Sequence, residues 1–157
     1  MDFSGLYQRY APDVYRFALY LTGQRSDAED ITAETFARVW TSSVPLEMVT
    51  VKAYLFTIAR NLYRQGLRGK SRHVELDEGL QDPRSDPFAE VAQEERLQNT
   101  MVALQQLPEI SRSALLMYAL DGMPYEQISQ VLKLSLPAVK VKIHRARLAL
   151  AGISNEL

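Results

Sequence analysis

The sequence predicts an all-α protein made of two small helical domains joined by a flexible linker. Apolar residues recur at intervals of three or four along most of the chain, which is the spacing of one face of an α-helix. Neither the alternating pattern of a half-buried strand nor a glycine-rich strand-to-helix loop occurs. The acidic stretch His73–Asp86 has no helical periodicity and separates the two halves. We therefore expect domains at residues 1–72 and 95–157, with the linker at 73–94.

The first domain is expected to contain three helices. Their predicted ranges are Leu6–Leu21, Ser26–Trp40 and Lys52–Leu67. Gly23 follows the first range and is typical of a helix C-terminus. Ser26 and Glu29 have the spacing of a capping box, in which the serine hydroxyl accepts a hydrogen bond from the backbone of the glutamate. A break containing Pro45 separates the second helix from the third.

The second domain is expected to contain four helices, the last two of which form a helix-turn-helix. Their predicted ranges are Pro87–Leu107, with Asp86 as its N-cap, Ser111–Leu120, Tyr125–Leu132 and Leu136–Ala151. A short helix followed by a tight turn and a basic helix is typical of DNA-binding proteins.

A helical wheel of the last helix gives it an apolar face formed by Val139, Ile143, Ala146 and Leu150. Lys140 and Arg147 flank this face on one side, and Lys142 and Arg145 flank it on the other. Val141 points away from the core, where it suits the methyl group of a thymine in a major groove. The alternative is an ordinary cationic amphipathic helix packed on the protein.

The composition limits the class of protein. With 46% hydrophobic and 24% charged residues among 157, the chain has a globular composition. The absence of cysteine excludes disulfide scaffolds, cysteine-based zinc sites and thiol nucleophiles. No apolar run approaches the ~20 residues that span a bilayer, and the first residues lack the features of a signal peptide. We expect a cytoplasmic protein with no membrane span.

The net charge of −1 is unevenly distributed. Residues 1–72 carry +3, residues 73–96 carry −6 and residues 97–157 carry +2. Two segments, Arg60–Arg72 and Lys133–Arg147, each contain five basic residues and no acidic one. Two concentrated basic segments indicate two contacts with a polyanion.

In the first basic segment, Arg60, Arg64 and Arg68 recur every four residues and share one helix face. Such a face can neutralise several phosphates. Tyr54 and Phe56 lie nearby, and aromatic rings beside cations suit unstacked bases. The alternatives are a solvated arginine face and, for Phe56, a place in the core.

Asp30 and Glu34 lie one turn apart on the exposed face of the second predicted helix. Paired carboxylates can perform acid–base catalysis, but only in a pocket that shifts a pKa. No histidine lies nearby in the sequence, and His73 and His144 are isolated. We expect a protein-docking face or a solvated face here, and no enzyme activity, cofactor or metal.

Five segments, in their order and spacing, resemble the extracytoplasmic-function (ECF) sigma factors of bacterial RNA polymerase. The segments are LYQRYAPDVYRFALYLTG, DAEDITAETFARVW, AYLFTIARNL, LPEISRSALLMYALDGMPYEQISQVL and VKVKIHRARLAL. The resemblance implies an initiation factor, not an enzyme. Its first domain would be region 2, which binds core polymerase and melts the −10 element, and its second would be region 4, which reads the −35 element.

The resemblance also implies partners and a location. The partners are promoter DNA, the β′ clamp helices and β flap of core polymerase, and an anti-sigma factor, with no small-molecule substrate. The implied location is the cytoplasm, at the nucleoid within the holoenzyme or tethered to a membrane through an anti-sigma factor.

The resemblance assigns three sets of residues to binding surfaces. The set for core polymerase comprises Asp30, Ala33, Glu34 and Arg38. The set for the −10 element comprises Lys52, Tyr54, Phe56, Arg60, Asn61, Arg64 and Arg68, beside a specificity loop at Thr41–Val51. The set for the −35 element comprises Ser135, Pro137, Ala138, Lys140, Val141, Lys142, His144, Arg145 and Arg147.

Several residues depart from the family pattern. Ala33 stands where glutamine is usual, and Lys133 stands at a usual glycine position in the turn. Pro137 and Ala138 replace the usual Gly-Thr, so that Ser135 becomes the candidate cap of the last helix. Lys142 replaces an arginine and loses the bidentate fork that reads guanine best. We expect a −35 preference that differs from the family norm.

The residues leave two other interpretations of the function open. A sigma-like decoy that binds a regulator without DNA would not need the two basic segments. A simple helix-turn-helix repressor would leave the acidic helix and the first arginine segment without a role. The acidic linker and the low net charge also predict weak promoter binding by the free protein.

Overall fold

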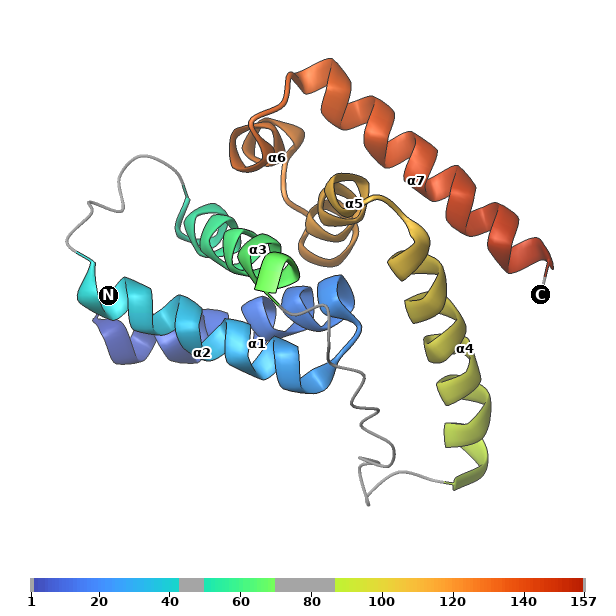
Figure 1. The fold of residues 1–157 in the computed structure, drawn as a ribbon, viewed down its shortest axis with the longest axis horizontal. Helices are drawn as coiled ribbons and strands as arrows, with labels where there is room; N and C mark the ends of the chain where they lie inside the picture. The colour runs from blue at the N-terminus through green and yellow to red at the C-terminus, as the bar shows by residue number, and fades with distance from the viewer. Residues whose placement is uncertain (1, 43–49, 70–86, 157) are drawn as a thin grey trace.

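The computed structural model of the chain describes residues 2–42, 50–69 and 87–156. These residues form seven α-helices and no strand, which confirms the all-α prediction (Figure 1). The helices are α1 (Phe3–Thr22), α2 (Arg25–Thr41), α3 (Val51–Gly69), α4 (Pro87–Gln106), α5 (Glu109–Asp121), α6 (Tyr125–Leu132) and α7 (Leu136–Glu156). The predicted linker core His73–Asp86, including the N-cap at Asp86, and most of the loop Thr41–Val51 lie outside the described residues.

Helix α1 begins earlier than predicted because Asp2 caps it. The Asp2 carboxylate accepts a hydrogen bond from the backbone N–H of Gly5 at 2.8 Å. At the other end, Gly23 has a φ of 73°, and its N–H donates to the carbonyl of Leu19 at 2.8 Å. Glycine is the residue that adopts this left-handed conformation most readily. The predicted stop at Gly23 is confirmed.

The predicted capping box at the start of α2 is wrong. Helix α2 begins at Arg25, and its N-cap residue, Gln24, makes no side-chain capping hydrogen bond. Only two residues separate α1 from α2, so the chain has entered the helix before it reaches Ser26. The backbone N–H of Gln24 donates to the hydroxyl of Thr22 at 3.1 Å within this tight connection. Ser26 and Glu29 are exposed.

Helices α1, α2 and α3 pack together, with α1 and α2 forming a hairpin (Figure 1). The rings of Phe17 on α1 and Phe56 on α3 are stacked, with centroids 4.6 Å apart and planes 8° apart. Both side chains are completely buried. Phe56 is therefore a core residue in this structure, as one of the two sequence interpretations expected.

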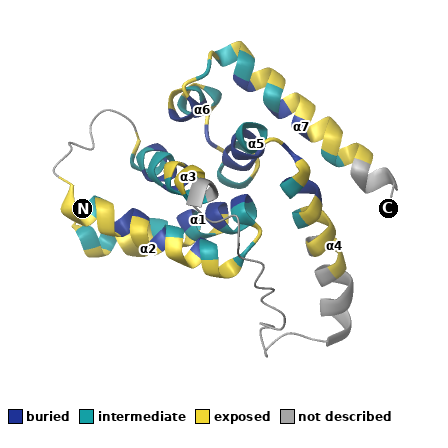
Figure 2. Cartoon of the chain, in the orientation of Figure 1, coloured by how far each residue is buried: buried dark blue, intermediate teal, exposed yellow. Residues whose placement is uncertain are grey.

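Helix α5 lies at the centre of the molecule (Figure 1). Its six consecutive residues Arg112–Met117 are all buried, and Figure 2 shows that almost none of its surface is exposed. A helix buried on every side needs neighbours on every side. Helix α1 packs against α5 from the first half of the chain, and α4, α6 and α7 pack against it from the second half. One hydrophobic cluster consequently includes residues of both halves.

The helix-turn-helix has the predicted helices, with a three-residue turn at 133–135. Lys133 takes the left-handed conformation, with a φ of 56°, and caps α6. The hydroxyl of Ser135 accepts a hydrogen bond from the N–H of Ala138 at 3.3 Å, which confirms Ser135 as a cap of α7. The predicted apolar face of α7 is confirmed by the buried residues Val139, Ile143 and Ala146 and by Leu150, which packs against them.

Candidate nucleic-acid and protein interfaces

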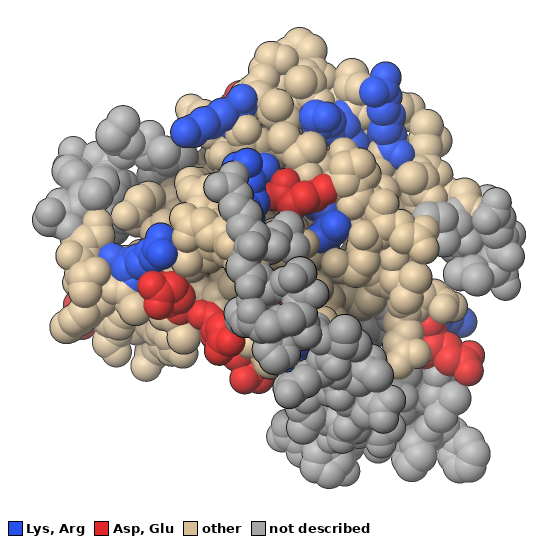
Figure 3. All heavy atoms as spheres, in the orientation of Figure 1, with Lys and Arg blue, Asp and Glu red and all other residues tan. Residues whose placement is uncertain are grey.

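The first candidate surface is the exposed side of α7. Its outward residues Val141, His144 and Arg145 are exposed, and Lys142 is partly exposed. Val141 is 45% exposed and lies among cations, which is unusual for a solvated helix and suits a base methyl group. At the start of the helix, Ser135 and Pro137 are exposed and Ala138 is half-buried. In Figure 3, lysine and arginine side chains are gathered over α6 and α7, at the top of the molecule.

The other two cations of α7 lie over aromatic rings. The ammonium of Lys140 is 5.9 Å from the ring centroid of Tyr125, and the guanidinium of Arg147 is 4.8 Å from that of Tyr118. The two tyrosine rings are stacked on each other, with centroids 5.1 Å apart. Such cation–π contacts hold long side chains in place. Lys140 and Arg147 thus lie together on one flank of α7, as the helical wheel predicted.

The tyrosine pair was not among the predicted site residues. The hydrogen bond from Tyr125 lowers the pKa of Tyr118, and Arg147 lowers it further. The same hydrogen bond raises the pKa of Tyr125, with burial adding to the effect. Tyr118 lies on α5 and Tyr125 on α6, so no local sequence pattern links the two rings. The only feature of the sequence that could have indicated this site is the aromatic residue at the start of α6, Tyr125.

The second candidate surface lies on α3. Asn61 and Arg64 are exposed, and Tyr54 is half-buried with its hydroxyl 3.4 Å from that of Ser42. Arg68 lies in α3, but its side chain is outside the described part. Lys52 faces another helix, because its ammonium lies 3.2 Å from the carboxylate of Asp13 on α1.

The predicted arginine face of α3 is not continuous in this structure. Arg60 is only 6% exposed. Its guanidinium donates two hydrogen bonds to the carboxylate of Glu109 on α5, at 2.7 and 3.0 Å. The expectation that Arg60 shares an exposed face with Arg64 is therefore wrong for this conformation. Phe56, from the same predicted set, lies in the core and offers no ring face to a base.

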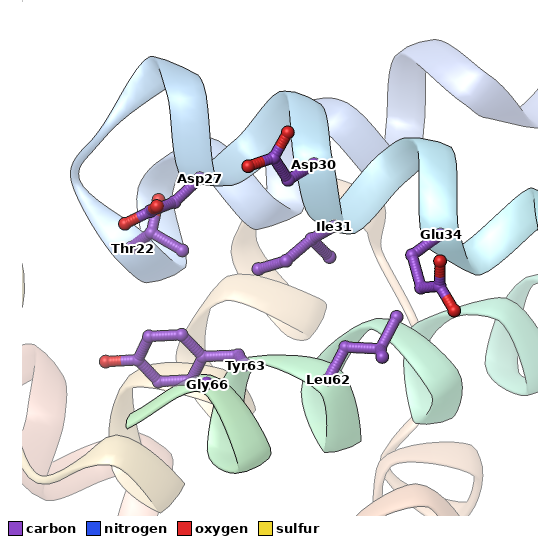
Figure 4. Close-up of a pocket in the computed structure, with 8 residues that line it drawn as sticks. All are labelled: Thr22, Asp27, Asp30, Ile31, Glu34, Leu62, Tyr63 and Gly66. Atoms are coloured by element: carbon purple, nitrogen blue, oxygen red, sulfur yellow. The ribbon is translucent and has the colours of Figure 1, made fainter. Parts of the chain in front are cut away.

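The third candidate surface is a groove of about 220 Å³ between α2 and α3. Figure 4 shows the carboxylates of Asp30 and Glu34 on the α2 side, with Ile31 and Leu62 directed toward the space between the helices. The groove is lined by Thr22, Asp27, Asp30, Ile31, Glu34, Leu62, Tyr63 and Gly66. An apolar floor beside a row of carboxylates fits a helix that carries apolar and basic residues.

The predicted polymerase-binding residues lie along this part of α2. Asp30, Ala33, Glu34 and Arg38 are all exposed. Arg38 and Glu34 form a surface ion pair of 3.3 Å, which a charged partner can displace at little cost. Acidic side chains form a row along the lower left of Figure 3, where α2 lies, away from the cations over α6 and α7. The two candidate surfaces of opposite charge are therefore well separated.

Among the described residues, no three histidine or acidic side chains come together as a metal site. None of the helices in the described ranges is both long and apolar enough to cross a membrane.

Two family models match the chain, one in each half. The family model "Sigma-70 region 2" matches residues 6–73, and the model "Sigma-70, region 4" matches residues 97–150. The ECF RNA polymerase sigma factor SigM of Bacillus subtilis is 31% identical over 160 residues, with 99% of this chain and 96% of SigM covered. The ECF sigma factor SigE of Mycolicibacterium smegmatis is 35% identical over 147 residues, which cover 90% of this chain but only 57% of SigE.

Solved structures have the same fold. The sigma factor RpoE of Bartonella quintana, in complex with the anti-sigma factor NepR, superposes with a TM-score of 0.80 at 22% identity, covering 98% of this chain and 97% of RpoE. CnrH, in complex with the cytosolic domain of CnrY, superposes with a TM-score of 0.75 at 24% identity, covering 98% of this chain and 88% of CnrH.

The helix-turn-helix, the acidic helical groove and these matches define a two-region transcription initiation factor. The chain belongs to the ECF RNA polymerase sigma factors, which direct promoter-specific initiation by core polymerase. This confirms the resemblance, the fold and the general function expected from the sequence.

Proposed function

We propose that the chain binds core polymerase through the α2–α3 groove, reads the −35 element with α7 and contacts the −10 element with the exposed part of α3. The proposal divides the chain into region 2 at 1–72, a linker at 73–94 and region 4 at 95–157. The protein performs no bond chemistry itself, needs no cofactor and acts in the cytoplasm beside its promoter.

The observation that carries the proposal is the opposite charge of two separate surfaces. The carboxylates of Asp30 and Glu34 line an apolar groove, whereas Lys142 and Arg145 project from a helix-turn-helix. Phosphates repel the first surface and attract the second. One surface therefore suits a protein partner and the other suits DNA. Each contact is modest, and joining both regions in one chain makes the second contact intramolecular.

The −10 contact rests on fewer residues than the sequence predicted. Asn61 and Arg64 are exposed, and Tyr54 offers a half-buried ring to an unstacked base. Arg60 joins them when its contact with Glu109 opens. In the proposed melting of the −10 element, these side chains hold the unstacked bases.

Run-off transcription with reconstituted core polymerase tests the proposal. A promoter is first selected from a random library by the holoenzyme. Reversing Asp30 and Glu34 to lysine should abolish both core binding and transcription. Glu29→Lys is the matched control, because Glu29 is exposed on the same helix but does not line the groove. Unchanged core binding by the double reversal would refute the groove assignment.

The −35 contact is tested with Arg145→Ala and Lys142→Ala. Each should reduce initiation several-fold on the selected promoter and have little effect when the −35 element is scrambled. Equal losses on both templates would mean that the two side chains contact only the DNA backbone. A sigma-like decoy would give no transcript on any template.

We also propose that an anti-sigma factor covers the α2–α3 groove. RpoE, which shares this fold, was solved in complex with the anti-sigma factor NepR. Capture of a host protein should require the groove, so the Asp30 and Glu34 reversal should abolish capture while Glu29→Lys retains it.

A further inference from the structure

The stacked tyrosine pair lies among three helices of the second half of the chain. Tyr118 is on α5 and Tyr125 is on α6, and the planes of their rings are 24° apart. Helices α5, α6 and α7 pack against one another (Figure 1). Both tyrosines are half-buried, so each is packed on the protein yet partly open to solvent. The pair is therefore a fixed aromatic surface beside α7.

The side chain of Arg147 lies on this surface. Its guanidinium is 4.8 Å from the ring centroid of Tyr118. A cation is attracted to the face of an aromatic ring because the face is the negative part of the ring quadrupole. Tyr118 is on α5 and Arg147 is on α7, so the contact ties the far end of the arginine side chain to a second helix. Because Tyr118 is itself stacked on Tyr125, the ring beneath the guanidinium has little freedom to turn.

The charge of Arg147 is not neutralised by a carboxylate. Arg16, Arg38 and Arg60 each form an ion pair, at 3.4, 3.3 and 2.7 Å. Arg147 is exposed and forms no ion pair with an acidic residue of the described ranges. The same is true of Lys140, whose ammonium lies over the other ring of the pair. A ring holds a cation in place without cancelling its charge, so the cation still attracts an anion.

The position of Arg147 on α7 favours a phosphate over a base as that anion. In a helix-turn-helix, the first residues of the second helix contact the base edges, and the first helix crosses the DNA backbone. Arg147 lies about 16 Å along the axis of α7 from its first residue, Leu136. The major groove is about 12 Å wide, so a side chain this far along an inserted helix lies at the edge of the groove. Phosphates line that edge.

We propose that Tyr118 is a positioning residue that holds Arg147 as a preformed contact with a phosphate of the promoter backbone. The inference rests on the proposed −35 contact of α7 and adds to it a residue of α5. A long side chain loses rotamer freedom when it binds, and a side chain already held by a ring loses less. Phosphate contacts fix the orientation of a protein on the duplex. Tyr118 thus supports the orientation in which α7 reads the −35 element.

Promoter binding by the reconstituted holoenzyme, measured over a range of salt concentrations, tests the phosphate contact. Arg147→Ala should weaken binding about tenfold and reduce the slope of log affinity against log salt by about 1, because one phosphate contact is lost. The loss should be equal on promoters with single changes in the −35 element, since a phosphate carries no sequence information. A loss that depends on the base pair, with an unchanged slope, would make Arg147 a base contact and overturn the proposal.

A double-mutant cycle tests the role of Tyr118. Tyr118→Leu should weaken promoter binding about threefold to tenfold in the wild type and no further in Arg147→Ala, because Tyr118 acts through that side chain. Arg145 lies on the other flank of α7, so Tyr118→Leu and Arg145→Ala should have additive effects. An equal loss with and without Arg147 would mean that Tyr118 supports the fold or binds DNA itself, which would overturn the proposal.

Further variants separate the ring from the fold. Tyr118→Phe keeps the ring beneath Arg147 and should retain most of the affinity that Tyr118→Leu loses. Tyr10→Leu is the matched control, because Tyr10 is also half-buried with an arginine, Arg9, 5.5 Å from its ring centroid, but lies on α1. It should bind the promoter as the wild type does. A Tyr118→Phe variant as weak as Tyr118→Leu would refute the role of the ring.

Circular dichroism and core binding check the folding of each variant. If Tyr118→Leu does not fold, Tyr118→Met removes the ring with a more adaptable side chain, and the cycle is repeated with it. If scrambling the −35 element did not weaken binding by the wild-type holoenzyme, the proposed function of α7 would be wrong, and the role of Tyr118 with it. If binding depended on the −35 element but the cycle were additive, only the role of Tyr118 would be wrong.

Discussion

The guanidinium of Arg112 on α5 donates a hydrogen bond of 2.7 Å to the carbonyl of Leu21 at the end of α1. The same side chain donates to the Tyr63 hydroxyl at 2.9 Å and to the carbonyls of Leu104, Gln105 and Leu107. Carbonyls at helix C-termini have no partner within their own helix and carry partial negative charge. One buried cation thus satisfies the ends of α1 and α4 together.

Arg112→Ala should therefore destabilise the whole protein. It leaves several buried carbonyls and the tyrosine hydroxyl without a donor, and the expected cost is about 3 kcal/mol or more of unfolding free energy. Urea denaturation followed by circular dichroism measures the change. Arg112→Lys should restore only part of the lost stability, because a lysine ammonium cannot donate to all of the acceptors that the guanidinium contacts. A loss below about 1 kcal/mol for the alanine variant would contradict this role.

Phe56→Ala should reduce stability by about 3–5 kcal/mol, because it removes a fully buried ring that stacks on Phe17. Tyr54→Ala should cost much less, since Tyr54 is half-buried. Thermal unfolding of the two variants makes the comparison. If Phe56 instead contacted an unpaired base, Phe56→Ala would impair promoter melting while leaving the unfolding temperature unchanged.

Lys133→Gly should stabilise the protein by about 0.5–1 kcal/mol. Lys133 has a φ of 56°, and glycine adopts this conformation without the steric cost that a Cβ atom brings. Lys133→Ala is the control, because it removes the charge and keeps the strain. Chemical denaturation should rank glycine above both lysine and alanine, and an equal gain from alanine would assign the effect to charge.

Asp121 should make stability depend on pH. Burial raises the pKa of its carboxyl above the ordinary value, despite the neighbouring Lys52 and Arg16, and Asp13 raises it further. One of its oxygens, Oδ2, is buried without a hydrogen-bond partner among the described residues. The folded protein consequently binds this proton more tightly than the unfolded chain does.

The folded state should therefore lose stability as the pH rises from the ordinary aspartate pKa through the raised one. Asp121→Asn cannot ionise and should lack this contribution. The difference in unfolding free energy between wild type and Asp121→Asn should shift in favour of the variant as the pH increases across that window. A difference that stays constant with pH would show that Asp121 keeps an ordinary pKa.

The sequence alone determined the all-α class, the family and most helix boundaries. Apolar spacing is a local property, so it correctly placed Val139 and Ile143 on the buried face of α7 and Val141 outside. Gly23 ended α1 where its backbone freedom predicted. The predicted capping box at Ser26 is wrong although the sequence has the Ser-x-x-Glu pattern. Only two residues connect α1 to α2, so α2 begins at Arg25, before the chain reaches Ser26.

Only the tertiary structure decided which side of each helix meets another helix. Arg60 and Arg64 share one stripe in the sequence, but α5 covers the first and leaves the second in water. Glu109 lies 49 residues from Arg60, and Arg112 lies 91 residues from Leu21. Periodicity assigns a residue to a face of its own helix, whereas a contact between distant segments depends on how all the helices pack at once, which no local pattern encodes.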